Sequence, residues 1–307
     1  MTAPGIASTR FGLSPNALGA LYMTLGSLAY VVNDGLVRLA AEEGLDVYQA
    51  LFLRGCAMIV IFAVASHHRN QRLRLTSVTR PLLARVAAEV AGTAMFFAAL
   101  VRLDFANAQT ILMLVPFAVT VVAARLGEHV TLGRYGLILI GFAGVVCVIR
   151  PTPSDFSPWT LLVAASAVAL VAREFATQRI RADIAPLPIA LLTAIAITAM
   201  MGVISIGTGW GPITLRAVVI LMLACLCLVA GYLFVIETVR VGDLSVSAPF
   251  RYTTVIGAVI IGVVMFNETP DLLTIIGCTL IIGAGVFNGR IRGKPAPAHQ
   301  SSFASPQ

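Results

Sequence analysis

The sequence is poor in charged residues and has almost no lysine. Asp, Glu, Lys and Arg together make up 11% of its 307 residues, and Lys294 is the single lysine. Because an average soluble domain carries about 25% charged residues, this chain cannot expose most of its surface to water. The hydrophobic content of 58% leads to the same conclusion. The composition therefore predicts an integral membrane protein.

Residues that build catalytic or metal centres are also scarce. The four histidines lie in connecting segments or in the tail, and the five cysteines lie inside apolar runs. Neither set has the spacing of a zinc site. The sequence therefore predicts no cofactor, no metal ion, no catalytic residue and no enzymatic activity. A membrane-embedded enzyme that modifies lipids is the least favoured alternative.

The net charge of +7 comes mostly from arginines in short connectors between apolar runs. Such a distribution is typical of topology signals and not of a nucleic-acid surface. If the N-terminus is cytoplasmic, thirteen basic residues fall on the inner side and four on the outer side, namely Arg38, Arg102, Arg150 and Arg216. We therefore expect a multi-pass protein of the cell (inner) membrane, with both termini cytoplasmic, a lipid bilayer around it and no nucleic-acid partner.

Ten segments are long and apolar enough to span a bilayer, which takes about 20 residues of helix. They cover residues 16–37, 47–66, 82–101, 106–125, 132–150, 158–178, 187–206, 213–236, 244–266 and 272–290. Open backbone finds no water in the bilayer core, so the runs should be helical. The fold class predicted is all-α integral membrane, and the first run is a spanning helix and not a signal peptide.

An internal repeat links the two halves of the chain. The segments "LGEHVTLGRYGLILIGFAGVV" and "FNETPDLLTIIGCTLIIGAGVF" both place a Glu at a helix boundary, followed by two Gly residues eight positions apart. Glu128 and Glu268 are 140 residues apart, as are Asp34 and Glu174. Because each copy has five spans, the second copy must enter the membrane from the opposite side. Inverted repeats of this kind support alternating access, with a binding site near the membrane midplane.

The repeat also predicts the domain boundaries. We expect a disordered cytoplasmic N-terminus, a first five-helix repeat, a second five-helix repeat and a disordered cytoplasmic tail. These cover residues 1–15, 16–150, 151–290 and 291–307, respectively.

Taken together, the ten runs and the two Glu and Gly motifs resemble the EamA-type branch of the drug/metabolite transporter superfamily. The stretches "VIRP", "REFATQRI" and "APFRYTTVIGAVIIGVVMFNETPD" are similar to the branch that contains bacterial riboflavin and S-adenosylmethionine importers. The resemblance implies a secondary active transporter of a small organic metabolite, without ATP hydrolysis. It leaves open the substrate and the direction of transport. A lipid flippase or a non-transporting membrane partner is the main alternative.

Ionisable residues inside predicted spans are functional candidates, because a charge in hydrocarbon is costly. The predicted substrate-binding residues are Arg54, Glu89, Arg251, Tyr252, Arg85, Asp34 and Tyr232. The arginines would hold carboxylate, phosphate or carbonyl groups, Glu89 would hold a cationic group or carry a proton, and the tyrosines would line the passage or stack on a ring. The alternative is purely structural pairing, of Arg85 with Glu89 and of Arg251 with Glu237.

Four features stay open on the sequence alone. Proton coupling is possible but not required, and both a monomer and a homodimer are compatible with the sequence. Glu128 and Glu268 are expected at opposite membrane faces, as helix-terminus or gate residues. Pro116, Pro249 and Gly257 are either hinges or packing kinks.

Overall fold

The computed structural model is all-helical over the part of the chain that it describes, residues 14–71, 78–125, 132–149, 157–180, 184–241 and 247–291. The first half contains α1 (Pro15–Glu42), α2 (Val47–His68), α3 (Arg80–Leu100), α4 (Phe105–Leu112), α5 (Val115–Arg125) and α6 (Leu132–Ile149). The second half contains α7 (Pro158–Gln178), α8 (Pro186–Thr208), α9 (Leu215–Val241), the 3₁₀ helix η2 (Ala248–Tyr252), α11 (Thr253–Phe266) and α12 (Leu272–Ile291).

Local signals explain where several helices begin. The Ser14 hydroxyl accepts a hydrogen bond from the Ala17 amide at 3.3 Å, and the Asp46 carboxylate accepts bonds from the amides of Tyr48 and Gln49. Such N-caps satisfy amides that the first helical turn leaves without partners. Pro15 stands in the first turn of α1, where its missing N–H costs nothing.

Six described helices are long and apolar enough to cross a membrane, and three shorter apolar helices accompany them. The protein is therefore a multi-pass membrane protein. The number of ten spans stays a prediction. The structure does not describe Glu128, most of the predicted 1–15 segment or most of the predicted 291–307 tail. Of the 1–15 segment, Ser14 and Pro15 are described and form the cap and the first residue of α1. Of the tail, Ile291 is described and is the last residue of α12.

Two of the predicted spans are not continuous α-helices. The run at 106–125 is divided into α4 and α5 at Met113 and Leu114, whose amides donate to carbonyls three residues back. Pro116 follows directly, and a proline has no amide with which to continue the α-helical ladder. The run at 244–266 enters α11 through η2, which contains Pro249. Both breaks border the central cavity described below.

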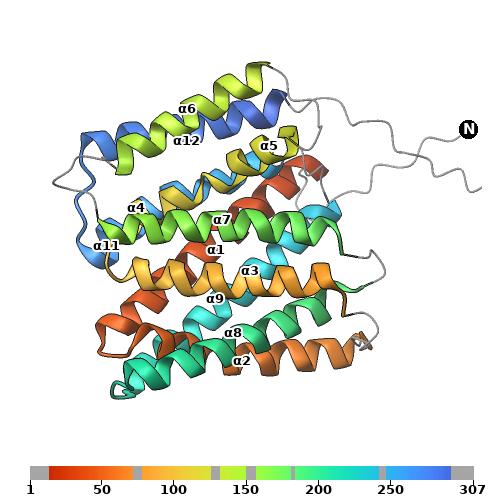
Figure 1. The fold of residues 1–307 in the computed structure, drawn as a ribbon, viewed down its shortest axis with the longest axis vertical. Helices are drawn as coiled ribbons and strands as arrows, with labels where there is room; N and C mark the ends of the chain where they lie inside the picture. The colour runs from red at the N-terminus through yellow and green to blue at the C-terminus, as the bar shows by residue number, and fades with distance from the viewer. Residues whose placement is uncertain are drawn as a thin grey trace, which may run out of the picture.

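The helices pack in pairs that interchange when the two halves are exchanged. Helix α1 packs on α9 and α3 packs on α7, while α2 packs on α8 and α6 on α12 (Figure 1). If α1, α2, α3 and α6 correspond to α7, α8, α9 and α12, the first two pairs map onto each other and the last two map onto themselves. In Figure 1, α6 with α12 and α2 with α8 form the two ends of the assembly, with α1, α3, α7 and α9 between them.

Candidate functional site

A cavity of about 580 Å³ lies between the two halves of the chain. Its described lining comes from α1 to α4 and the residue after α4 in the first half, and from α7, α8, α9, η2 and α11 in the second. The volume falls in the range of roughly 300–1,000 Å³ that is common for small-molecule sites. Both halves build the walls, so this cavity is the candidate functional site.

One group of polar side chains in the lining, the Asp34 cluster, consists of Asn33, Asp34, Arg54 and Gln109. Arg54 Nη1 donates to Asn33 Oδ1 at 2.8 Å, and Asn33 Nδ2 donates to Asp34 Oδ1 at 2.8 Å. Gln109 Nε2 donates to the other carboxylate oxygen of Asp34, also at 2.8 Å. The cluster joins α1, α2 and α4, and both oxygens of Asp34 accept from amide groups.

Arg54 is the most deeply buried charge of this cluster, with 7% of the residue exposed. Its guanidinium carbon lies 5.7 Å from the ring centroid of Phe97, within the range of a cation–π contact. Its Nε is buried and has no hydrogen-bond partner. A buried donor without a partner costs about 1–3 kcal/mol, and an oxygen acceptor beside this Nε would remove that penalty.

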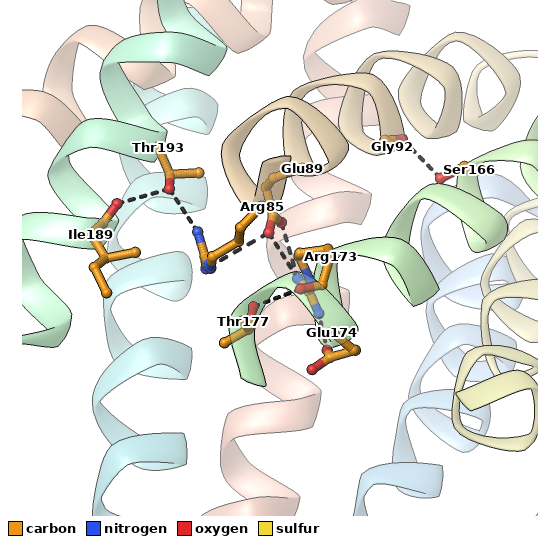
Figure 2. Close-up of polar contacts among 9 residues, drawn as sticks. All are labelled: Arg85, Glu89, Gly92, Ser166, Arg173, Glu174, Thr177, Ile189 and Thr193. Atoms are coloured by element: carbon orange, nitrogen blue, oxygen red, sulfur yellow. Dashed lines mark hydrogen bonds and ion pairs between the residues drawn. The ribbon is translucent and has the colours of Figure 1, made fainter. Parts of the chain in front are cut away.

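A second group, the Arg173 cluster, consists of Arg85, Glu89, Arg173, Glu174 and Thr193 (Figure 2). Arg173 Nη1 donates to both carboxylate oxygens of Glu89, at 3.1 and 3.0 Å, and Arg173 Nη2 donates to Glu174. Arg85 Nη1 donates to Thr193 Oγ1 at 2.8 Å, while its Nη2 lies 3.9 Å from Glu89 Oε2. The cluster therefore ties α3 to α7 and α8, and Glu89 faces two guanidiniums.

The main partner of Glu89 is thus Arg173 on α7, whereas the sequence suggested Arg85 on the same helix. The sequence also placed Gln109 and Thr193 in no cluster, although a glutamine amide inside an apolar run was a visible signal. The sequence contained no such signal for Thr193, because many threonine hydroxyls in helices bond only to a carbonyl of their own helix. In this structure Thr193 Oγ1 donates to the Ile189 carbonyl of its own helix and also accepts from Arg85.

Six of the seven predicted site residues line the cavity: Asp34, Arg54, Arg85, Glu89, Tyr232 and Arg251. Tyr232 meets Phe62 edge to face, with ring centroids 5.5 Å apart. Whether any of the six contacts a solute stays a prediction.

The described lining does not include Tyr252, so our expectation for this residue needs correction. Tyr252 is 6% exposed, and its ring centroid lies 6.0 Å from that of Phe117. Its ring also covers Gly285 of α12. Consecutive residues of a 3₁₀ helix point about 120° apart, so η2 turns Arg251 to the cavity and Tyr252 into the core. Within the described chain, no ion pair joins Arg251 to Glu237.

Glu268 lies where the sequence expected a helix-terminus residue. Its carboxylate accepts from the amide of Phe105 at 2.6 Å and from that of Ala106 at 3.4 Å, at the start of α4. Arg38 of α1 donates to the same carboxylate at 2.8 Å and to the Leu103 carbonyl at 3.0 Å. Negative charge at a helix N-terminus is stabilising. Glu268 thus connects the segment after α11 to α1 and α4, and a gate role stays a prediction.

Comparison with known proteins agrees with this geometry. The model of the EamA-like transporter family matches twice, at residues 17–150 and 157–289. The chain is 26% identical over 164 residues to the S-adenosylmethionine uptake transporter of Rickettsia prowazekii, which is 53% of this chain and 55% of that protein. The chain therefore matches about half the length of that relative.

Two other relatives match over most of their length. The pseudopaline exporter of Pseudomonas aeruginosa is 24% identical over 281 residues, covering 89% of this chain and 96% of the exporter. The riboflavin transporter of Rhizobium johnstonii is 24% identical over 280 residues, covering 88% and 90%. A crystal structure with 20% identity and a TM-score of 0.59 covers 90% of this chain and 98% of its own, which shows a common fold.

The two family matches together span nearly the whole described chain, and each contributes helices to the walls of the central cavity. The chain belongs to the EamA-like transporter family.

Proposed function

We propose that this protein is a secondary transporter that moves a small organic solute through the central cavity by alternating access. The observation that carries the proposal is the cavity itself, whose polar walls come from both family repeats. We further propose ten spans in two inverted five-helix repeats, residues 16–150 and 151–290, in the cell (inner) membrane with both termini cytoplasmic.

The pairwise packing supports the inverted arrangement. Arg216 at the start of α9 lies 3.2 Å from Glu43 after the end of α1, so these two helices run antiparallel. Arg102 after the end of α3 lies over the ring of Trp159 at the start of α7, so this pair is antiparallel as well. A two-fold axis in the membrane plane would interchange the two pairs, as expected for inverted repeats.

The central position of the cavity favours a solute over a lipid as cargo. A flippase, the alternative, would need a lateral groove open to the bilayer, whereas the polar groups here converge from helices of both halves, α1 to α4 in the first and α7, α8, α9 and η2 in the second. The named relatives include an uptake transporter and an exporter, so we assign no direction. Riboflavin, S-adenosylmethionine and aromatic amino acids are the first solutes to test.

The sequence suggested Glu89 as the carboxylate that carries a proton, and its contacts lead us to propose a different one. Glu89 accepts two hydrogen bonds from Arg173 and also faces Arg85, so guanidinium groups already engage its carboxylate. Among the described residues, Asp34 accepts only from the amides of Asn33 and Gln109, and Arg54 reaches it through Asn33. If transport is coupled to protons, Asp34 is the proposed carrier.

Transport by the purified protein in liposomes tests the function. Solutes would first be screened by thermal shift, because a ligand at 100 times its Kd stabilises a protein by about 2.7 kcal/mol. We expect Arg54→Gln to abolish uptake of the solute found. Arg216→Gln should leave uptake unchanged, because the Arg216 side chain is 73% exposed and lies outside the cavity. Asp34→Asn should remove any dependence on a pH gradient. Normal uptake by Arg54→Gln would contradict the proposed site.

A further inference from the structure

The carboxylates that line the cavity already have partners within the protein. The two oxygens of Asp34 accept from Asn33 and Gln109, each at 2.8 Å. Both oxygens of Glu89 accept from Arg173, and Arg85 lies 3.9 Å from one of them. A cationic group of a solute would therefore share either carboxylate with donors that the protein already supplies.

Two cationic side chains of the lining keep donor groups for which the described residues supply no acceptor. Arg54 is more than nine-tenths buried, and its Nε has no partner. Arg251 is exposed and lines the cavity, and its guanidinium has no hydrogen bond or ion pair to any other residue in the described ranges. Since guanidinium groups are rigid, permanently charged donors that match planar oxyanions, Arg251 is available to a ligand, and Arg54 adds a second, buried positive charge to the lining.

The charge of the described lining agrees with this difference. It contains four arginines and two carboxylates, namely Arg54, Arg85, Arg173, Arg251, Asp34 and Glu89. Glu174, which pairs with Arg173 outside the lining, reduces the excess but leaves it positive. A cleft with low-dielectric walls and charge of one sign raises the local concentration of counter-ions.

We infer that the solute carried by this cavity is an organic anion whose carboxylate or phosphate group binds Arg251 and which the buried charge of Arg54 also attracts. The inference rests on the proposed function and specifies its substrate class. The ring of Phe97 beside Arg54 and the neighbouring ring of Phe96 provide the apolar wall for the body of the solute. A solute whose distinguishing group is cationic, such as the sulfonium of S-adenosylmethionine, finds no free carboxylate here.

Charged thiol reagents measure the sign of the cavity without knowledge of the solute. Ala190 lines the cavity on α8, one turn before Thr193. The Ala190→Cys protein would be treated separately with an anionic and a cationic methanethiosulfonate. Each reaction rate would be divided by the rate of the same reagent with a free thiol in solution, after subtraction of the rate measured with the protein that lacks the added cysteine. We expect the anionic reagent to react at least about tenfold faster than the cationic one.

Variants test which residue causes the faster reaction of the anionic reagent. Arg251→Gln should lower the ratio several-fold and Arg251→Lys should keep it, whereas Arg216→Gln, which removes the same charge outside the cavity, should leave it unchanged. If Ala190→Cys does not react, Leu228→Cys offers a second lining position. Equal rates, or a faster cationic reagent, would overturn the inference, as would a ratio that Arg251→Gln does not alter.

A matched pair of solutes separates this inference from the proposed function. Riboflavin 5′-phosphate and riboflavin share a ring and differ in one anionic group. Among such pairs, the anionic member should bind more tightly, and Arg251→Gln should remove the difference. Transport of only neutral or cationic solutes would overturn the anion preference while leaving a transporter. A positive cavity in a protein that transports nothing would overturn the proposed function instead.

Discussion

At the scale of single residues, the buried charges are held by hydrogen bonds from distant helices. Arg173 gives Glu89 two bonds across the contact between α3 and α7, and Arg54 is connected to Asp34 through Asn33. Burial of an unpaired ion costs several kcal/mol, whereas a pair with complete hydrogen bonds offsets most of that cost. The pairs therefore allow charges to border a cavity inside an apolar bundle.

Substitution of Arg173 should destabilise the protein, because Glu89 then lacks its main hydrogen-bond partner. We expect Arg173→Gln to lower the free energy of unfolding by about 1–3 kcal/mol, below the 3–5 kcal/mol of fully buried pairs, because the two side chains are 26% and 18% exposed. Denaturation in detergent measures the change. The double variant Arg173→Gln, Glu89→Gln should recover part of the loss, and equal loss in single and double variants would contradict a direct pair.

At the scale of helices, two kinds of position set the geometry. Pro116 stands in the first turn of α5 and Pro249 in the first turn of η2, and the cavity lies beside both breaks. Helices α6 and α12 cross where Gly144 faces Gly277, and a Cβ on Gly144 would lie 2.7 Å from the Gly277 carbonyl oxygen. Small residues at such crossings let two backbones approach closely.

A methyl group at this crossing should separate the two helices. We expect Gly144→Ala to destabilise the protein by about 1–3 kcal/mol, as overpacking commonly does, because the obstructing atom is backbone and not a flexible side chain. Gly136→Ala on the same helix is the control, since a Cβ there meets nothing within 4 Å. Thermal unfolding of both variants is the measurement, and equal transition temperatures would show that the crossing is not tight.

At the scale of the whole molecule, Glu268 joins segments that are far apart in the sequence. Its carboxylate holds Arg38 of α1 and the N-terminus of α4, and the ring of Phe266 lies 4.2 Å from the Arg38 guanidinium. These contacts lie at the Glu42 end of α1, the outer end in our proposed topology. Alternating access would require them to break when the cavity opens on that side.

Weakening this contact should favour opening at that end. A hydrogen bond to a charged group contributes about 1.5–3 kcal/mol, so Glu268→Gln should raise the outside reactivity of Ala190→Cys by about tenfold, which corresponds to ~1.4 kcal/mol. An impermeant reagent added to intact cells measures it. Glu42→Gln removes a half-exposed carboxylate 3.6 Å from Arg38 and should have little effect. Equal reactivity in both variants would argue against a gate at Glu268.

The sequence alone determined the membrane class, the helical fold and the family, because these depend on local features. Apolar runs of bilayer length are legible without partners, and so are the Glu and Gly motifs that occur twice. The same features pointed to six residues that do line the cavity. Each was found because a polar group in an apolar run is conspicuous wherever it finally lies.

Only the tertiary structure decided how these residues pair and which way they face. Glu89 and Arg173 are 84 positions apart, and Asp34 and Gln109 are 75 apart. Their contact depends on the rotation and the neighbours of each helix, which a hydrophobic run does not encode. The same applies to η2, whose 3₁₀ geometry turns Arg251 to the cavity and Tyr252 to Phe117. Composition therefore identifies the charges, whereas packing decides which of them pair with one another.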